Sequence, residues 1–490
     1  MIDTASLVTF IVYLVLLMAI GIYFYRTTSN LEDYLLGGRG LGRWVTAFSA
    51  QASDMSGWLM MGLPGAVYLA GMPAAWIAIG LFIGTALNWR LVAARLRVYT
   101  QITGSLTLAS FFEERFGDPS GLLRTITALI TLIFFTIYAS SGLVASGKLF
   151  ESMFHMDYTT TVVLGGMFII IYTFLGGFLA VCYTDLLQGA LMVIAIVVVP
   201  AIGCYMAGGP AAIASAMASR GIPSGLVPAG GFSVLAIISA AAWGLGYFGQ
   251  PHILTRFMGI RSGSEVPGAT AIALVWVGIS LAGAIAVGLI GIPLFEGLSG
   301  GDEEKVFLRM IGTALAPWVR GVMLAAVLSA IMSTIDSQLL VSSSTLTEDF
   351  YKKAIRPDAS EREMMFVGRA SVIIISVIAL LLALKPGNTI LGLVAYAWAG
   401  FGAAFGPVVL AALFSRRTGW RAALAGMVTG TVVLVVWKSL GFGAVLYEIV
   451  PGFAANLAAI LIVDRMDSGP DEPAKRRFDE VVRTVRNFQS

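Results

Sequence analysis

The sequence predicts an all-α integral membrane protein with about 13 transmembrane helices. The chain has 490 residues, of which 58% are hydrophobic and 12% are charged, whereas soluble domains carry about 25% charged residues. Apolar stretches of bilayer length, roughly 20 residues, recur along the whole chain. These stretches are expected to be helices, because backbone groups in lipid must bond internally. A soluble enzyme, a disordered protein and a nucleic-acid-binding protein are disfavoured, and a net charge of +3 suggests no polyanionic partner.

The candidate spans fill residues 1–465, which we interpret as one transmembrane domain. Residues 466–490 are polar and are interpreted as a solvated cytoplasmic tail that is helical near its end. In chain order the 13 spans are 6–26, 42–69, 72–92, 121–147, 159–177, 184–207, 231–255, 268–296, 314–345, 365–384, 388–414, 420–440 and 444–463.

The distribution of positive charge predicts the orientation. Of the 31 Lys and Arg residues, 24 fall in the connections after spans 1, 3, 7, 9 and 11 and in the tail. The other connections hold the remaining seven. Because basic connections tend to stay in the cytoplasm, we expect an external N-terminus and a cytoplasmic C-terminus.

Spans 2 and 7 contain residues that disfavour an unbroken helix. Asp54 lies mid-span in span 2, where a charge costs at least ~2.5–3.5 kcal/mol and usually marks an ion or substrate path. A carboxylate that caps a broken helix end is the structural alternative, and the two roles are compatible. In span 7, three glycines and a proline fall within residues 242–251. Close helix packing by the glycines is the alternative there.

The spacing of these two interrupted spans predicts an inverted repeat. Spans 2 and 7 are five apart, an odd number, so the second set of five enters from the opposite face. Paired interruptions in corresponding positions of two halves indicate a transporter site. We therefore expect a five-plus-five core with discontinuous helices 2 and 7, built from residues 42–207 and 231–414, with spans 1, 12 and 13 at the periphery.

One face of span 9 carries small and hydroxyl residues. Ala330, Ser333, Thr334 and Ser337 fall at i, i+3, i+4 and i+7. Hydroxyls together with free carbonyls of a broken span 2 suit a small hard cation, and few full charges favour a monovalent one. Hydroxyls that only bond back to their own helix are the alternative. Asp185, at the predicted mouth of span 6, would line an exit path or anchor a helix start.

Two patterns that look like nucleotide motifs lack the required context. Residues 142–148 read G-x-x-x-x-G-K, but Leu149 replaces the Ser or Thr that holds magnesium. Residues 244–249 read G-x-G-x-x-G without a strand–turn–helix setting. No nucleotide partner and no ATP-driven pump are predicted.

The quoted strings resemble a known family, the solute:sodium symporters, in order over nearly the whole chain. The resemblance rests on residues 37–39, 53–65, 138–142, 243–252, 332–340 and 347–349. The strings in spans 2 and 7 are the more specific ones and favour the branch of the family that carries proline. The resemblance implies the five-plus-five inverted repeat shared with the bacterial leucine transporter.

The resemblance also implies roles for individual positions. Sodium would be held by backbone oxygens of Ala52, Met55 and Ala330 and by the hydroxyls of Ser333 and Thr334. L-Proline would be surrounded by Ser56, Tyr138, Trp243 and Tyr247, with Gln250 and Pro251 shaping the break in span 7.

Four further positions would act in coupling or on the ion path. Asp54 would be needed for sodium-dependent binding without necessarily touching the ion. Arg39 would influence coupling from the cytoplasmic end of span 2, and Asp185 would match an acidic position on the inward sodium path. At Asp336 relatives are expected to vary, so the resemblance does not itself imply the second cation contact that this carboxylate could make.

The implied function is sodium-coupled import of L-proline across a bacterial inner membrane by alternating access, with sodium as the co-transported ion and no organic cofactor. Two alternatives remain open at this stage. The same fold could carry another amino acid, a carboxylate or a sugar. A membrane sensor could bind the solute without carrying it, although no signalling module is attached to the short tail.

Overall fold

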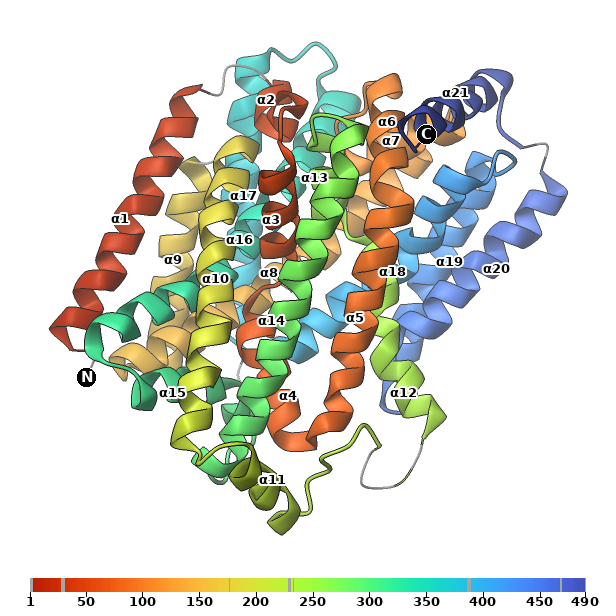
Figure 1. Cartoon of the computed structure of the whole chain (residues 1–490). Coiled ribbons are helices and arrows are strands. Elements are labelled where there is room, and N and C mark those ends of the chain that lie inside the picture. Colours follow the sequence, from red (N-terminus) through yellow and green to blue (C-terminus); the bar gives the residue numbers. More distant parts are fainter. Residues whose placement is uncertain are drawn as a thin grey trace.

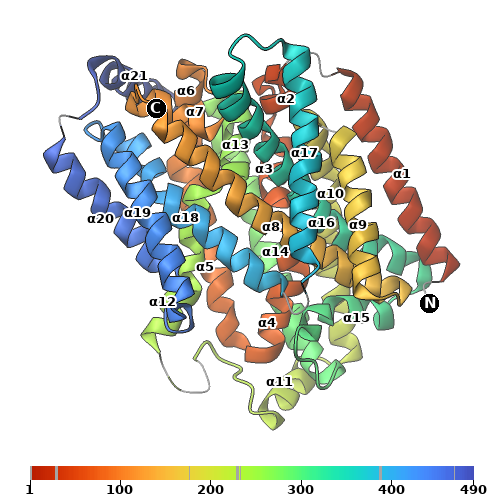
Figure 2. The same cartoon turned by 180° about the vertical axis from the view of Figure 1, so that it is seen from behind.

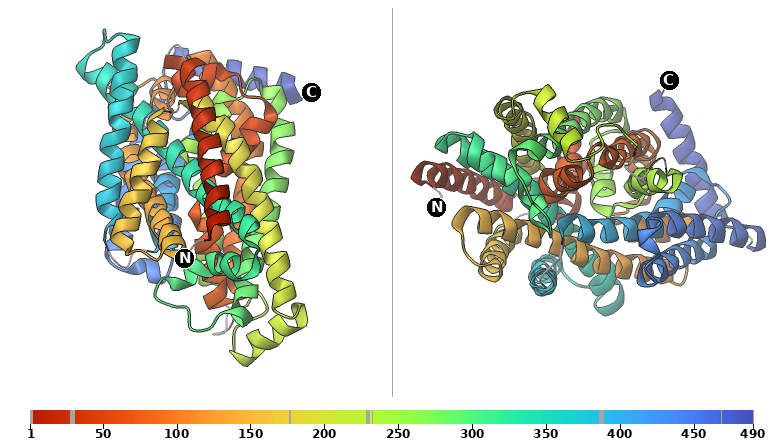
Figure 3. Two further views of the ribbon diagram at one scale, coloured as in Figure 1. Left: turned by 90° about the vertical axis from the view of Figure 1, so that its left-hand side faces the viewer. Right: turned by 90° about the horizontal axis from the view of Figure 1, so that it is seen from below.

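A computed structural model of the chain describes residues 3–27, 31–175, 177–227, 231, 233–385, 389–467 and 469–489. The elements in these ranges are helices joined by loops, which confirms the predicted all-α class. Most helices run between two ends of one bundle (Figure 1). Seen from below, the N-terminal helix and the C-terminal helices lie at opposite ends of an elongated cross-section (Figure 3).

Ten helices among the described residues are long and apolar enough to cross a membrane. They comprise α1 (Thr4–Thr27), the run of α5 (Ala75–Asn88), η4 (Trp89–Ala93) and α6 (Ala94–Thr103), α8 (Leu122–Phe154), α10 (Phe178–Met206), α14 (Val266–Leu294), α16 (Pro317–Ser344), α17 (Glu361–Ala383), α18 (Ile390–Phe414), α19 (Trp420–Ser439) and α20 (Ile449–Met466). The other three predicted spans coincide with α9 (Tyr158–Leu175) and with two interrupted helices, so the count of 13 spans stays a prediction.

The first interruption lies where span 2 was predicted to break. Helix α3 (Arg43–Asp54) ends at Met55, whose ψ of 75° leaves the helical region. The chain resumes as the π-helix η2 (Trp58–Gly62) and then α4 (Leu63–Ala70). The last carbonyls of any helix lack partners within that helix, so this break exposes backbone acceptors inside the bundle.

The second interruption lies in the predicted span 7. Helix α12 (Val234–Ala241) tightens into the 3₁₀-helix η5 (Ala242–Gly249). Gln250 is extended, and α13 (Pro251–Gly259) starts at the proline, which fits the first turn of a helix because it needs no N–H there. The glycines of η5 also pack closely: a Cβ added at Gly84 of α5 would lie 2.6 Å from Gly244 Cα. The glycines of η5 therefore both permit the break in the helix and allow close packing against α5.

Several predicted span boundaries need correction. Helix α10 begins at Phe178, so Asp185 lies two turns inside it and not at its mouth. The third span continues to Thr103, so Arg95 and Arg97 lie within the helical run instead of after it. Helix α8 extends to Phe154 and runs obliquely across the bundle against α16, α17 and α18 (Figure 2).

The C-terminal tail is more ordered than the predicted solvated extension. Helix α21 (Glu472–Gln489) buries Phe478, Val481 and Val485 against α6 and α7 (Leu108–Phe116). Arg416, between α18 and α19, pairs with Asp479 of α21 at 2.9 Å. The hydrogen bond from Arg416 lowers the pKa of the Asp479 carboxyl, so the pair persists into mild acid and is lost as the pH falls through that lowered pKa.

Opposite ends of the bundle are closed by different contacts. Helices α2 (Leu31–Leu36), α6, α7 and α21 lie at one end, whereas α4, α11 (Pro210–Ser219) and α15 (Val306–Ala314) lie at the other (Figure 1). At the first end, a parallel bridge joins Leu41 to Ile260. At the second end, Lys148 of α8 pairs with Glu304 of η7 (Asp302–Lys305) at 2.5 Å.

Candidate functional site

Four oxygens from α3 and α16 converge at the break in α3. The hydroxyl of Ser333 donates to the Ala52 carbonyl at 2.7 Å, and that of Thr334 reaches the same carbonyl at 3.3 Å. Both hydroxyls also lie 3.4 and 3.2 Å from the carbonyl oxygen of Ala330. All four residues are buried. The hydroxyls thus bond across to the broken helix and not only back to their own, and the cluster is the kind of oxygen set that holds a hard cation.

Asp54 lies at the same break and joins it to η5. Its Oδ2 accepts a hydrogen bond from the Tyr247 hydroxyl at 2.6 Å. Its backbone carbonyl accepts from Ser56 N at 2.9 Å and from the indole N–H of Trp58 at 3.0 Å. The other carboxylate oxygen, Oδ1, is buried and has no hydrogen-bond partner among the described residues. The backbone carbonyl of Asp54 therefore accepts the bonds that turn the chain at the break, whereas its carboxylate bonds Tyr247 and keeps a second, unbonded oxygen inside the bundle.

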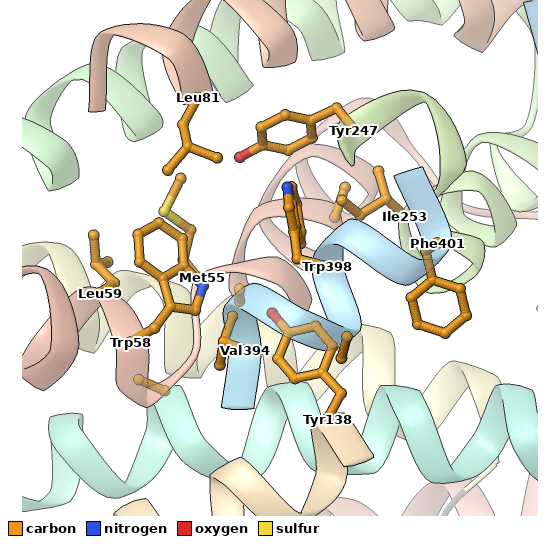
Figure 4. Close-up of a cluster of buried hydrophobic side chains, with 14 of the residues drawn as sticks. Met55, Trp58, Leu59, Leu81, Tyr138, Tyr247, Ile253, Val394, Trp398 and Phe401 are labelled. Atoms are coloured by element: carbon orange, nitrogen blue, oxygen red, sulfur yellow. The ribbon is translucent and has the colours of Figure 1, made fainter. Parts of the chain in front are cut away.

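Aromatic side chains from four elements gather beside this break in a buried cluster, the aromatic enclosure. Trp58 of η2, Tyr138 of α8, Tyr247 of η5 and Trp398 of α18 point toward one another (Figure 4). Trp398 and Tyr247 meet edge to face with ring centroids 5.0 Å apart. Each of the four residues is 1% exposed, so the cluster is shielded from solvent.

Trp243 and Gln250 complete the wall on the η5 side. The indole N–H of Trp398 donates to the Trp243 carbonyl at 2.7 Å, and Trp243 stacks on Tyr447 with centroids 5.5 Å apart. The Gln250 amide donates to the carbonyls of Gly246 and Trp398, both at 3.2 Å. Because η5 cannot bond all of its own carbonyls after the break, these side chains do so and fix its path.

A buried charged network lies one turn away from the oxygen cluster. Arg256 of α13 and Asp185 of α10 are both fully buried and pair at 3.4 Å. Ser49 of α3 donates to Asp185 at 2.7 Å and accepts from Arg256 at 3.1 Å. Arg256 also bonds Ser337, whose hydroxyl donates to the Ser333 carbonyl at 2.7 Å. The network thus connects three helices, α3, α10 and α13, to the hydroxyl face of α16.

The model of one protein family matches the chain over most of its length. A profile named sodium:solute symporter family matches residues 34–430. This chain belongs to that family.

Similar proteins have names that agree with the family. The sodium/proline symporter of Escherichia coli (strain K12) is 47% identical over 486 residues, which cover 98% of this chain and 96% of the relative. The high-affinity proline transporter PutP of Bacillus subtilis (strain 168) is 46% identical over 472 residues, 96% of this chain and all of the relative. A solved Na⁺-coupled sialic acid symporter shares the fold with a TM-score of 0.80 at 18% identity, over 96% of this chain and 99% of that one.

Two predicted positions of this symporter lie outside the cluster around the break. Arg39, in the 3₁₀ turn η1 (Gly37–Arg39), donates to the carbonyls of Ser105 and Met258 at 2.8 and 3.2 Å. It therefore ties the start of the first interrupted helix to the end of the second. Asp336 points to α9, where it accepts from Thr173, and its Oδ2 has no partner among the described residues.

The sequence missed two residues that the symporter brings into the site. Arg256 was counted with the basic connections, because the predicted span 7 ended at residue 255, whereas α13 continues to Gly259. Trp398 lies in an apolar, glycine-rich stretch, and nothing in that pattern distinguishes a residue of the site from an ordinary core residue. Met55 is the C-cap residue of α3 next to the cluster, and its role as a sodium ligand stays a prediction.

Proposed function

We propose that this chain is a sodium/proline symporter that imports L-proline by alternating access, driven by inward movement of sodium. One observation carries the proposal: the hydroxyls of Ser333 and Thr334 meet the Ala52 carbonyl, which the break in α3 sets free, beside the aromatic enclosure. Similarity to sodium/proline symporters over nearly the full length supports the same cargo. The chain moves its solute and does not alter it chemically.

Sodium binds between α3 and α16 in this proposal. The ligands are the carbonyl oxygens of Ala52, Met55 and Ala330 and the two hydroxyls on α16, with no full charge among them. Neutral oxygens suit a monovalent ion, which must be released again on the other side of the membrane. Asp54 supplies a negative charge next to the ion and holds η5 through Tyr247.

Proline binds beside the ion, within the aromatic enclosure. The three methylene groups of its pyrrolidine ring are apolar and suit the flat faces of Tyr138, Trp243 and Tyr247. Its carboxylate is attracted to the positive end of a helix that starts inside the membrane, here η2 with Ser56. The interrupted helices touch both ligands, so sodium binding favours the arrangement of α3 that binds proline, and proline in turn tightens sodium.

The driving force is sufficient for accumulation. One sodium ion that enters down an inside-negative potential of ~100 mV gains about 2.3 kcal/mol, and a tenfold sodium gradient adds about 1.4 kcal/mol. Proline is a zwitterion and carries no net charge, so the sum of about 3.7 kcal/mol supports roughly 500-fold accumulation at one-to-one coupling.

The charge asymmetry supports an orientation in a bacterial inner membrane. The end of the bundle with α2, α6, α7 and α21 carries most of the basic connections and is placed in the cytoplasm together with the C-terminus. The N-terminus is then external. Asp185 lies between the sodium cluster and the cytoplasmic end. Arg256 must therefore release Asp185 before that carboxylate can contact a sodium ion on its inward path.

Proteoliposome uptake tests the proposed function. Labelled L-proline should accumulate only with an inward sodium gradient, and uptake should be competed by unlabelled proline but not by glucose or sialic acid. Equal uptake in potassium alone would remove the sodium coupling. Stronger competition by a sugar or a carboxylate would assign a different cargo to the same fold.

A further inference from the structure

An apolar groove opens on the outer face of the bundle between α3, α10 and α14. It encloses about 530 Å³, and all of its lining side chains are apolar. Its rim is exposed: Trp44 is 55% and Val275 63% accessible. Its floor is formed by Trp276 and Phe48, with Trp276 held by a 3.1 Å hydrogen bond to the Gly189 carbonyl. The three helices stand side by side at the front of Figure 1.

A free positive charge lies at one end of this groove. The Arg43 side chain lies over Gly268 of α14, where an added Cβ would be 3.2 Å from its Cδ and 3.6 Å from its Nη1. Gly268 is one turn before Ala271 and Ile272, which line the groove. The Arg43 guanidinium has no ion pair among the described residues. The nearby Glu265 is bound to the backbone N–H of Arg43 at 2.8 Å and to Arg261 at 3.6 Å.

We propose that this groove binds one phospholipid, with an acyl chain on Trp44, Phe48 and Trp276 and its phosphate on Arg43. Apolar lining with one cation at the end of the groove matches an amphiphile with an anionic head. Arg43 begins α3, at the end of the bundle where the basic connections gather, which is the depth of lipid headgroups. An arginine pairs with phosphate through two parallel hydrogen bonds.

The bound lipid contacts the helix that carries the sodium cluster. Phe48 is one turn before Ala52 in α3, and Gly189 of α10 packs between them, since its added Cβ would lie 3.1 Å from Phe48 Cδ1 and 3.4 Å from Ala52 Cβ. A lipid that fills the groove therefore holds the first half of the interrupted helix against α10 and α14. This inference goes beyond the proposed transport and does not depend on which solute is carried.

Lipid retention by the full chain tests the proposal. After exchange into detergent, native mass spectrometry should detect one phosphatidylglycerol or phosphatidylethanolamine per chain, added in separate arms to distinguish the headgroups. Ala271→Trp fills the groove and should remove the bound lipid. Arg43→Gln should lower retention about tenfold or more, because it removes the charge-assisted hydrogen bonds to the phosphate. Retention by Ala271→Trp at the wild-type level would overturn the proposal.

Matched variants and a second readout keep the test independent of folding. Ala458→Trp, on the exposed face of α20, and Arg417→Gln, in an exposed loop, should retain lipid like the wild type. In the wild-type chain, a phospholipid with a photoreactive acyl chain should label α3, α10 and α14 preferentially. Even labelling of all lipid-facing helices would also overturn the proposal.

Discussion

At the scale of single residues, Ser333 connects the two halves of the proposed sodium site. Its hydroxyl is the shortest contact between α16 and the free carbonyl of Ala52. The spacing within span 9 alone predicted this hydroxyl face, because four small residues recur there at helical intervals in an otherwise apolar helix. The break in span 2 also predicted free carbonyls as partners, but the assignment to Ala52 came only from the resemblance, since a backbone oxygen leaves no mark in the sequence.

Ser333→Ala should weaken the binding of sodium more than the binding of proline. Loss of one oxygen contact to a charged group costs about 1.5–3 kcal/mol, so the sodium concentration for half-maximal uptake should rise about tenfold or more. Proline affinity at saturating sodium should change little. Ser344→Ala is the matched control, because the Ser344 hydroxyl bonds only Leu340 O in its own helix. An unchanged sodium dependence in Ser333→Ala would contradict the assignment.

Tyr247→Phe should uncouple the two interrupted helices. The variant removes the 2.6 Å hydrogen bond to Asp54 and leaves a buried carboxylate without its donor. Equilibrium binding should show weaker sodium-dependent proline binding. Tyr68→Phe, which loses a hydroxyl contact to Phe295 O away from the site, should bind as the wild type does. Equal binding by both variants would exclude a role for the Asp54–Tyr247 contact.

At the scale of elements, the breaks in the second and seventh helices were predictable because their residues conflict with a continuous helix. Asp54 in lipid and the glycines before Pro251 give that signal directly. Their form was not predictable: a π-helix after Met55 and a 3₁₀-helix before Gln250 depend on tertiary contacts. The docked face of α21 was also missed, because a polar tail sequence does not reveal the surface it packs against.

Gly84→Ala tests the close contact of α5 with η5. In a helix this change normally stabilises by about 0.5–1 kcal/mol, but here the new Cβ meets the backbone of Gly244. We expect a lower melting temperature and strongly reduced uptake. Gly312→Ala, where nothing lies within 4 Å of the new Cβ, should be neutral or stabilising. A stabilised Gly84→Ala would show that the two elements do not pack as described.

Phe478→Ser tests whether α21 is held on the bundle. Burial of a phenylalanine contributes about 1.5–3 kcal/mol, so amide hydrogen exchange in α21 should accelerate about tenfold or more in the variant. Glu480→Ser, on the exposed face of the same helix, should leave exchange unchanged. Rapid exchange of α21 already in the wild type would mean that the helix is a solvated extension after all.

At the scale of the whole molecule, contacts between residues far apart in the sequence hold each end of the bundle together. Glu304 accepts from the backbone N–H groups of Ile390 and Leu391, both at 3.0 Å, and so caps α18 while it pairs with Lys148. The five-plus-five arrangement followed from the odd spacing of two breaks. The pairing of Lys148 with Glu304, 156 positions apart, could not be predicted from a local pattern, because both residues look like ordinary loop charges in the sequence.

Lys148→Met should destabilise the molecule as a whole. It leaves Glu304 buried without its partner, a loss of about 3–5 kcal/mol for a buried pair. The melting temperature of the purified protein should fall markedly. Lys353→Met, which breaks a half-exposed pair with Glu113, should cost no more than about 1 kcal/mol. Similar melting temperatures for both variants would contradict the proposed closure.

The central claim is that sodium, held between α3 and α16, favours the arrangement that binds proline. Equilibrium binding of labelled proline to the purified protein, titrated with sodium at constant ionic strength, tests it most directly. The account predicts that sodium lowers the Kd of proline, that proline lowers the Kd of sodium by the same factor, and that Ser333→Ala shifts the titration to higher sodium. Proline binding that is equal in sodium and potassium would contradict it.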